Sequence, residues 1–186
     1  MMDKFTQNDM LPFKVEESFM DNRIILIMED FTPSLAKTVI AKILYFDSIN
    51  DKDINIYMTS YGGMVDVLLS IIDAIKAARC KVNIYAVGVN CSAATVLLAC
   101  ATGKRKIYEH ASIMVHEVSG GAIGKMTDMG VDYEHAKSLQ ETVFDLLVKH
   151  TKITREWLDK AGSKDMWLSA KQALELGLVD EIITRK

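Results

Sequence analysis

The sequence predicts an α/β fold in which helices pack on a mostly parallel sheet. Short apolar runs typical of buried strands alternate along the chain with segments whose apolar residues recur at helical spacing. Repeated strand–helix units favour parallel strands, because a helix crossing over the sheet returns the chain to the same edge. With 186 residues, of which 49% are hydrophobic, the chain is long enough for one domain around one core.

Each element has its own local evidence. Runs such as RIILIM and VNIYAV are almost continuously apolar, as expected of strands covered on both faces. Thr32-Pro33 matches an N-cap followed by proline at the first helical position. The longest helix combines an apolar stripe with oppositely charged Asp145 and Lys149 one turn apart. The predicted strands are residues 23–28, 54–58, 82–87 and 112–115, and the predicted helices follow Thr32-Pro33 and cover residues 65–78, 92–101 and 128–150.

Composition excludes several classes of function. A net charge of −3 without long runs of one sign gives no electrostatic reason to expect nucleic acid or an anionic membrane as partner. The longest apolar stretch is too short to span a bilayer, and the N-terminus lacks the pattern of a signal peptide. Three cysteines without a CxxC pair predict buried reduced thiols, and the protein is expected in the cytoplasm. No metal-ligand cluster, P-loop or GxGxxG motif occurs, so no cofactor is expected.

Three segments carry residues suited to catalysis, and each has a purely structural alternative. Ser92 follows a strand and opens an apolar helix after small residues, where it is either a nucleophile on a sharp turn or a helix cap. Gly62-Gly63 allows either close approach of a ligand or an ordinary turn. His116 ends a strand and is either a base or a structural histidine, while His110, His135 and His150 lie in less persuasive contexts. Taken singly, these segments leave the alternatives open.

Taken together, these segments resemble the Clp protease proteolytic subunit from about residue 23 to residue 183. Several motifs in the same order and spacing carry the resemblance. They are Gly62-Gly63, the segment from Gly88 to Ala94 around Ser92, Gly103-Lys104-Arg105, Met114-Val115-His116, Asp165 before Trp167-Leu-Ser-Ala170, and Gly177-Leu-Val-Asp180.

The resemblance implies a serine endopeptidase with a catalytic triad of Ser92, His116 and Asp165. In such a triad the imidazole removes the proton of the serine hydroxyl, and the carboxylate fixes the imidazole tautomer and stabilises its charged form. The backbone N–H groups of Gly63 and Ala93 are the expected donors of the oxyanion hole.

The resemblance also implies a crotonase/ClpP-like fold with a projecting handle at about residues 117–150. Its long helix is expected to interdigitate with that of an opposed ring, beside a handle strand at residues 120–124. Two stacked heptameric rings, a tetradecamer, are expected to enclose the active sites and to exclude folded proteins. Residues 1–22 are a divergent N-terminal segment, expected as a docking region, and residues 23–186 a single peptidase domain.

The sequence departs from the family pattern at several places. Tyr61 replaces the proline of Ser-Pro-Gly-Gly, Glu117-Val118 replaces the Gln-Pro that follows the histidine, and Lys164 replaces an arginine before the acid. An AAA+ Clp unfoldase is the expected partner through an aromatic docking pocket. The positions that align with this pocket are Tyr57, which is retained, and Asn55 and Ala77, which offer less apolar surface.

Two alternative functions come from other classes. A crotonase-type acyl-CoA enzyme would share the fold and the two-amide oxyanion hole but would need no triad. A catalytically silent paralogue would support an active ring, and loss of a triad residue would mark it. The ordered Ser92, His116 and Asp165 argue against both.

Overall fold

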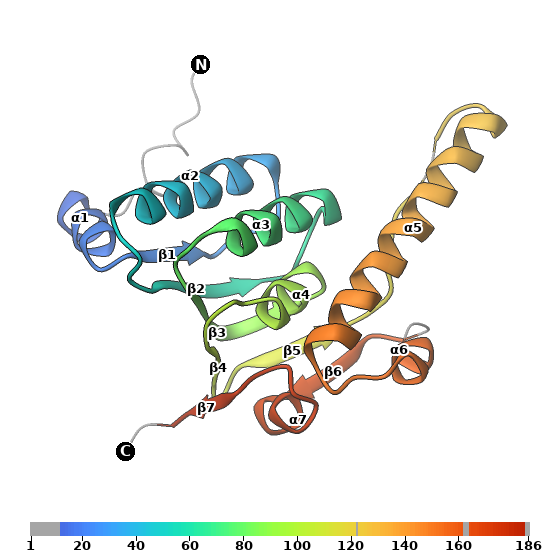
Figure 1. The fold of residues 1–186 in the computed structure, drawn as a ribbon. Helices are drawn as coiled ribbons and strands as arrows, with labels where there is room; N and C mark the ends of the chain where they lie inside the picture. The colour runs from blue at the N-terminus through green and yellow to red at the C-terminus, as the bar shows by residue number, and fades with distance from the viewer. Residues whose placement is uncertain (1–11, 122, 162–163, 185–186) are drawn as a thin grey trace.

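The strands form one sheet in a computed structural model that describes residues 12–121, 123–161 and 164–184 (Figure 1). The order is β1-β2-β3-β4-β7 with every neighbouring pair parallel, and β5 pairs with β3 on one side and antiparallel with β6 on the other. The prediction of an α/β fold with a mostly parallel sheet is confirmed. The strands are β1 (Ile24–Ile27), β2 (Ile54–Ser60), β3 (Val82–Cys91), β4 (Arg105–Tyr108), β5 (Ser112–Val115), β6 (Met166–Ser169) and β7 (Glu181–Ile183).

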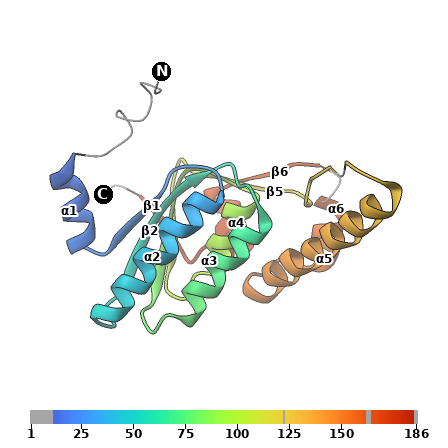
Figure 2. The ribbon, with the colours of Figure 1, turned by 90° about the horizontal axis from the view of Figure 1, so that it is seen from above.

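The helices α2, α3 and α4 lie along one side of the sheet, and α5 extends away from it as a long arm (Figures 1 and 2). Predicted helices and observed helices agree to within two residues at each predicted end, and Thr32 caps α2 by accepting a hydrogen bond from the Leu35 N–H as its sequence predicts. The helices are α1 (Phe13–Asp21), α2 (Pro33–Ile49), α3 (Val65–Ala77), α4 (Ala93–Ala99), α5 (Met126–His150), α6 (Arg155–Ala161) and α7 (Ala170–Glu175).

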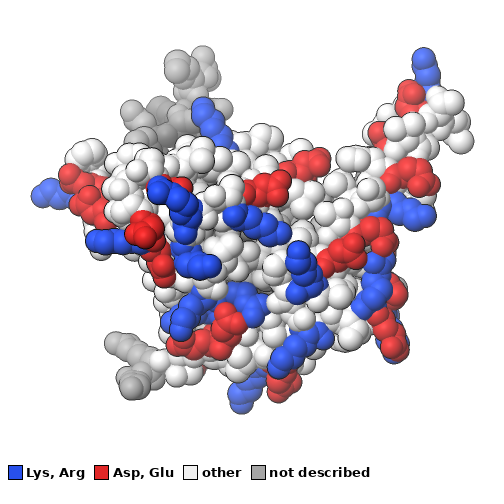
Figure 3. Space-filling view, viewed as in Figure 1, with Lys and Arg blue, Asp and Glu red and all other residues white. Residues whose placement is uncertain are grey.

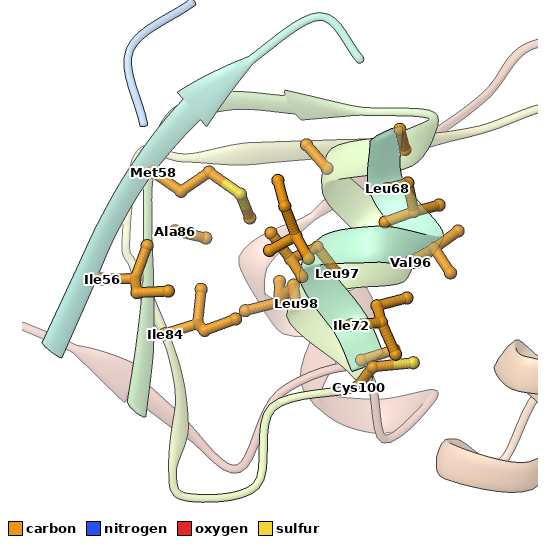
Figure 4. Close-up of a cluster of buried hydrophobic side chains, with 14 of the residues drawn as sticks. Ile56, Met58, Leu68, Ile72, Ile84, Ala86, Val96, Leu97, Leu98 and Cys100 are labelled. Carbon is orange, nitrogen blue, oxygen red and sulfur yellow. The ribbon is translucent and has the colours of Figure 1, made fainter. Parts of the chain in front are cut away.

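The core lies between β2 and β3 on one side and α3 and α4 on the other (Figure 4). Ile56 and Met58 of β2 face Leu97 and Leu98 of α4, and all four side chains are buried. Every residue of α4 is buried, which explains why its sequence is apolar throughout instead of striped. This burial fixes the helix that begins directly after Ser92.

The strand β3 changes partner along its length. Its first half pairs with β4 and its second half pairs with β5. Gly88 lies between the two halves with φ 59°, a backbone conformation that favours glycine. A Cβ there would approach the Thr59 hydroxyl to 3.2 Å. The change of partner carries the end of β3, and Ser92 after it, to the side of β5.

The first strand begins one residue later than predicted, because Arg23 is not extended. Arg23 has φ 56° and is buried, with its guanidinium over the Phe46 ring at 5.1 Å. The guanidinium donates hydrogen bonds to the carbonyls of Phe46, Lys52 and Asp53. Arg23 therefore holds the connection between α2 and β2 in place, and the sheet starts at Ile24.

Six short elements were missing from the predictions: the helices α1, α6 and α7 and the strands β4, β6 and β7. The handle strand predicted at residues 120–124 is not observed, since residues 120, 121, 123 and 124 lie outside any strand and Ala122 is outside the described residues. A strand needs a hydrogen-bonded neighbour, and among the described residues none pairs with this segment.

Basic and acidic side chains intermingle over the face of the molecule seen in Figure 3. This distribution agrees with the nearly balanced composition. Within the described ranges, every helix is too short or too polar to cross a bilayer.

Candidate active site

Ser92 lies on a sharp turn between β3 and α4. Its backbone has φ 56° and ψ −121°, and its hydroxyl makes no capping hydrogen bond to the helix. Apart from Arg23, it is the one non-glycine residue with positive φ in the described part of the chain. Such a conformation costs on the order of 1–3 kcal/mol and persists only where the surroundings enforce it. Helix capping is therefore not the role of this side chain.

The turn is anchored to the neighbouring strand β5. The Ser92 N–H donates to the Met114 carbonyl over 2.9 Å. The buried Thr95 hydroxyl lies 3.0 Å from the Asn90 carbonyl and 2.9 Å from the Met114 carbonyl, between the two acceptors. These contacts tie the end of β3 and the start of α4 to the strand that leads to His116.

Gly62 packs directly against this turn, and Gly63 packs against Phe31. Their φ angles are 104° and 141°. A Cβ on Gly62 would lie 2.7 Å from the Ser92 Cβ and 2.9 Å from the Cys91 carbonyl oxygen, and a Cβ on Gly63 would lie 2.7 Å from the backbone of Phe31. Both positions therefore require glycine, for conformation and for space. The close neighbours of this pair are parts of the protein itself, the Ser92 turn for Gly62 and Phe31 for Gly63, and the approach of a ligand stays a prediction.

Two backbone donors beside Ser92 remain uncommitted. Among the described residues, neither the Gly63 N–H nor the Ala93 N–H donates to a protein acceptor. Gly63, Ser92 and Ala93 all line one cavity. An uncommitted N–H that faces a cavity can donate to a ligand there.

His116 and Asp165 meet at the end of the antiparallel pair β5–β6. Val115 pairs with Met166, so the residues just beyond this pair come side by side. The His116 Nδ1 lies 3.9 Å from the Asp165 Oδ1, with the two side chains 23% and 62% exposed. This distance allows attraction between charges but is longer than a hydrogen bond.

The cavity beside Ser92 is small, about 60 Å³, and mostly apolar on the sides away from the serine. His116 lines it together with Ser92, so the structure brings these two predicted residues together. Asp165 lies behind His116 and does not line the cavity. The apolar lining comes from Val65, Leu68, Val96, Val115, Val118, Val143 and Leu147.

The contribution of the long helix to this cavity was not predicted. Val143 and Leu147 of α5 are buried and form part of the cavity wall. The sequence identified them as members of an apolar stripe, and an apolar stripe alone does not distinguish core packing from a binding wall. A side chain of comparable size and apolar character would fit the cavity.

The other histidines lie outside the cavity. His110 is 93% exposed, and its Nε2 lies 3.4 Å from Glu109. His135 is exposed on α5. His150 has a buried Nε2 without a hydrogen-bond partner among the described residues, and burial lowers the pKa of its imidazole.

All three cysteines are free and buried, as the sequence predicts. Burial raises the pKa of each thiol, most clearly that of Cys100, to about 11. After burial, the nearby Asp165 carboxylate raises the pKa of Cys91 further. Within the described residues, no group of His, Cys, Asp and Glu side chains is placed to hold a metal ion.

Comparisons with known proteins place the chain among peptidases. A sequence profile of the Clp protease family matches residues 7–186. An ATP-dependent Clp protease proteolytic subunit of Dehalococcoides mccartyi strain BAV1 is 37% identical over 175 residues, which are 93% of this chain and 88% of that protein. The subunit of strain CBDB1 gives the same values, and that of strain 195 is 36% identical over the same shares.

Proposed function

The chain belongs to the Clp protease family and is a serine endopeptidase, and on that premise we propose that Ser92 is its nucleophile, His116 its general base and Asp165 the acid that orients the base. The observation that carries this assignment is the uncapped Ser92 hydroxyl on a strained turn, in the same cavity as His116. Membership of the family removes the acyl-CoA alternative. The silent paralogue is tested below.

The proposed reaction follows acyl transfer through a tetrahedral intermediate. The Nδ1 of His116 is the atom nearest Asp165, so the Nε2 is left to take the proton of the Ser92 hydroxyl as its oxygen attacks the scissile carbonyl. The resulting imidazolium then protonates the leaving amine, and water hydrolyses the acyl-enzyme by the same route in reverse.

The oxyanion of the intermediate would be bound by the N–H groups of Gly63 and Ala93. Their lack of a protein acceptor among the described residues supports this role. One donor of this kind is worth roughly 3 kcal/mol of transition-state stabilisation in other serine hydrolases. The positive φ angles of Gly62, Gly63 and Ser92 give this turn a defined backbone conformation. Donors held in place before the reaction stabilise an oxyanion without having to move, which supports the proposed role.

The acid and the base need to come closer for full activity. A hydrogen bond between Nδ1 and Oδ1 requires a spacing of about 2.7–3.2 Å, against 3.9 Å here. Catalytic hydrogen bonds are often long before substrate binds and shorten in the complex. A modest movement of the exposed Asp165 side chain would suffice.

We propose that the protein works as an oligomer of two stacked heptameric rings, with residues 23–186 as one peptidase domain and its handle at about residues 117–150. Large apolar side chains on the outer half of the handle are exposed in the single chain: Ile123, Met126, Val131 and Tyr133. An exposed apolar surface of this kind is typical of an interface. Sedimentation that showed only monomer would contradict the ring assembly.

An AAA+ Clp unfoldase is the proposed partner. Tyr57 and Tyr85 stack with ring centroids 4.6 Å apart, which offers one aromatic platform. Asn55 instead accepts a hydrogen bond from Asn83, and Ala77 is small, so the neighbouring surface is less apolar. Of the N-terminal segment proposed for docking, residues 1–11 lie outside the described residues. ATP-dependent degradation with an unfoldase from the same host tests this partnership.

The buried reduced thiols suit a reducing compartment, and we place the protein in the cytoplasm.

The first experiment is labelling with a fluorophosphonate probe, on the wild type and on Ser92→Ala, with native mass spectrometry of the same samples. Wild-type protein should be labelled and should hydrolyse a fluorogenic peptide, and Ser92→Ala should lose both, because the substitution removes the proposed nucleophile. The loss should be on the order of 10⁶-fold in kcat, as for removal of a triad serine elsewhere. A well-assembled wild type without labelling would favour the silent paralogue.

A further inference from the structure

Val118 is the partition between two hollows of the protein. On one side it lines the cavity beside Ser92, and on the other it lines a second, more open hollow of about 390 Å³ along α5. No other residue in the described part of the chain lines both. Any shift of Val118 therefore changes the width of the cavity beside Ser92.

A hydrogen bond from α5 holds this partition. The Val118 N–H donates to the Gln140 side-chain carbonyl oxygen over 3.1 Å. Proline, which has no N–H, stands at this place in the family pattern that the sequence resembles, so the bond depends on the departure from that pattern. The backbone at Val118 lacks the constraint of a proline ring, and the hydrogen bond to the Gln140 side chain holds it instead.

The same face of α5 supplies both the bond and the wall opposite. Gln140, Val143 and Leu147 are spaced three and four residues apart and therefore lie on one side of the helix. Val143 and Leu147 line the cavity directly, while Gln140 sets the position of Val118. The distance between Val118 and the wall formed by Val143 and Leu147 is thus set by one helix, α5.

The catalytic base is held by other contacts. His116 follows β5, whose last residues pair with β6 and whose Met114 carbonyl accepts from the Ser92 N–H. The Gln140 bond is made two residues further on, at the start of the handle. Loss of that bond would therefore move the cavity wall and leave the base in place.

On the basis of the proposed function, we infer that Gln140 is a positioning residue that sets substrate selectivity. It holds Val118 against α5 and so defines the width of the cavity for the apolar side chain that precedes the scissile bond. Its effect falls on the affinity and selectivity for that side chain, and not on the reactivity of Ser92.

The test compares Gln140→Leu, Gln140→Glu and a matched control, Lys137→Leu, all checked for assembly by native mass spectrometry. Leucine keeps the bulk of glutamine without an acceptor, whereas glutamate keeps the acceptor. Lys137 lies one turn earlier on α5 and lines the same open hollow as Gln140. Each protein is assayed with two fluorogenic peptides that differ only in leucine or alanine before the scissile bond, and with a small fluorophosphonate.

Gln140→Leu should raise KM for the leucine peptide between about threefold and tenfold, the range expected for one lost hydrogen bond. The preference for leucine over alanine should fall by a similar factor, while kcat and the rate of labelling by the small probe stay unchanged. Gln140→Glu and Lys137→Leu should resemble wild type. An equal loss of labelling and hydrolysis in Gln140→Leu would overturn the inference, as would unchanged selectivity.

A double variant isolates the bond itself. Val118→Pro removes the N–H donor, so adding Gln140→Leu to it should have no further effect on selectivity. A full additional loss in the double variant would show that Gln140 acts by another route. Ser92→Ala separates the two proposals: if it retains hydrolysis, the proposed function fails, whereas a normal Gln140→Leu beside an inactive Ser92→Ala contradicts only the role of Gln140.

Discussion

The two sides of the candidate active site are held in different ways. The nucleophile side is a backbone turn in which buried Gly62 packs against half-buried Ser92 and leaves no room for a Cβ. The base side is the open end of the β5–β6 ribbon, where His116 and Asp165 are 23% and 62% exposed and 3.9 Å apart. One side is fixed by packing of the main chain, and the other by a contact between side chains near solvent.

The two sides should therefore respond differently to substitution. A methyl group added on the nucleophile side finds no free space, because protein interiors are close-packed. On the base side, water and side-chain freedom weaken a charge pair, so loss of one partner costs less than in a buried triad. The variants below test this contrast, from the largest expected effect to the smallest.

Gly62→Ala should have the largest effect. Its Cβ would lie 2.7 Å from the Ser92 Cβ at a φ of 104°, so both the turn and the Gly63 N–H must shift. Peptide hydrolysis should fall about 10³-fold, the upper range for loss of an oxyanion donor. Measured kcat/KM on a fluorogenic peptide checks this.

The control for Gly62→Ala is Gly130→Ala on α5, where a Cβ would meet nothing within 4 Å in the single chain, with assembly checked by native mass spectrometry because the proposed interface lies nearby. That variant should keep full activity and gain up to about 1 kcal/mol of stability, because alanine is the better helix former. Normal hydrolysis by Gly62→Ala would mean that the turn is not rigid and that the contrast between the two sides is wrong.

Asp165→Asn should have an intermediate effect. The acid of a buried triad is worth about 10⁴-fold in kcat, and the exposed, more distant carboxylate here should be worth about 10²-fold. Asp159→Asn, which removes an exposed carboxylate that pairs with Arg155 on α6, is the matched control and should leave kcat unchanged.

A much larger or a much smaller loss of kcat in Asp165→Asn would change the comparison between the two sides. A loss near 10⁴-fold would show that the working enzyme buries and shortens the His116–Asp165 contact. No loss at all would remove Asp165 from the triad.

The sequence predicted the elements whose own residues carry a regular apolar pattern. β1, β2, β3 and β5 have apolar runs, and α2, α3 and α5 have regular stripes, so local pattern was enough. The missed strands β4 and β7 mix charged and apolar residues and exist because neighbours pair with them. Nothing in the local pattern of β6 indicates that it runs antiparallel to β5.

The residues of the candidate site could be proposed from the sequence, but their geometry could not. Considered alone, Ser92 fitted a helix cap as well as a nucleophile, and the resemblance to a family decided between them. The positive φ of Ser92 and its contact with Gly62 arise from packing between β2 and β3. The Val118–Gln140 bond joins residues 22 positions apart and has no local signal.

The stability of the fold should respond weakly to pH through His150, at the end of the helix α5 whose Leu147 lines the cavity. Its Nε2 is buried without a partner among the described residues, and burial, then Lys76 of α3, Lys149 of α5 and Arg105 of β4, lower the pKa of its imidazole. The unfolded chain therefore binds this proton more readily than the folded one, and stability should fall as the pH drops below the ordinary histidine pKa of about 6.5.

His150→Phe should lose less stability than wild type between about pH 7 and pH 5.5, by a fraction of the limit of about 1.4 kcal/mol per pH unit for one proton. Urea unfolding at equal protein concentration measures this difference, with the exposed His110→Gln as control. An identical pH dependence in wild type and His150→Phe would show that His150 is protonated as easily in the folded protein as in the unfolded chain.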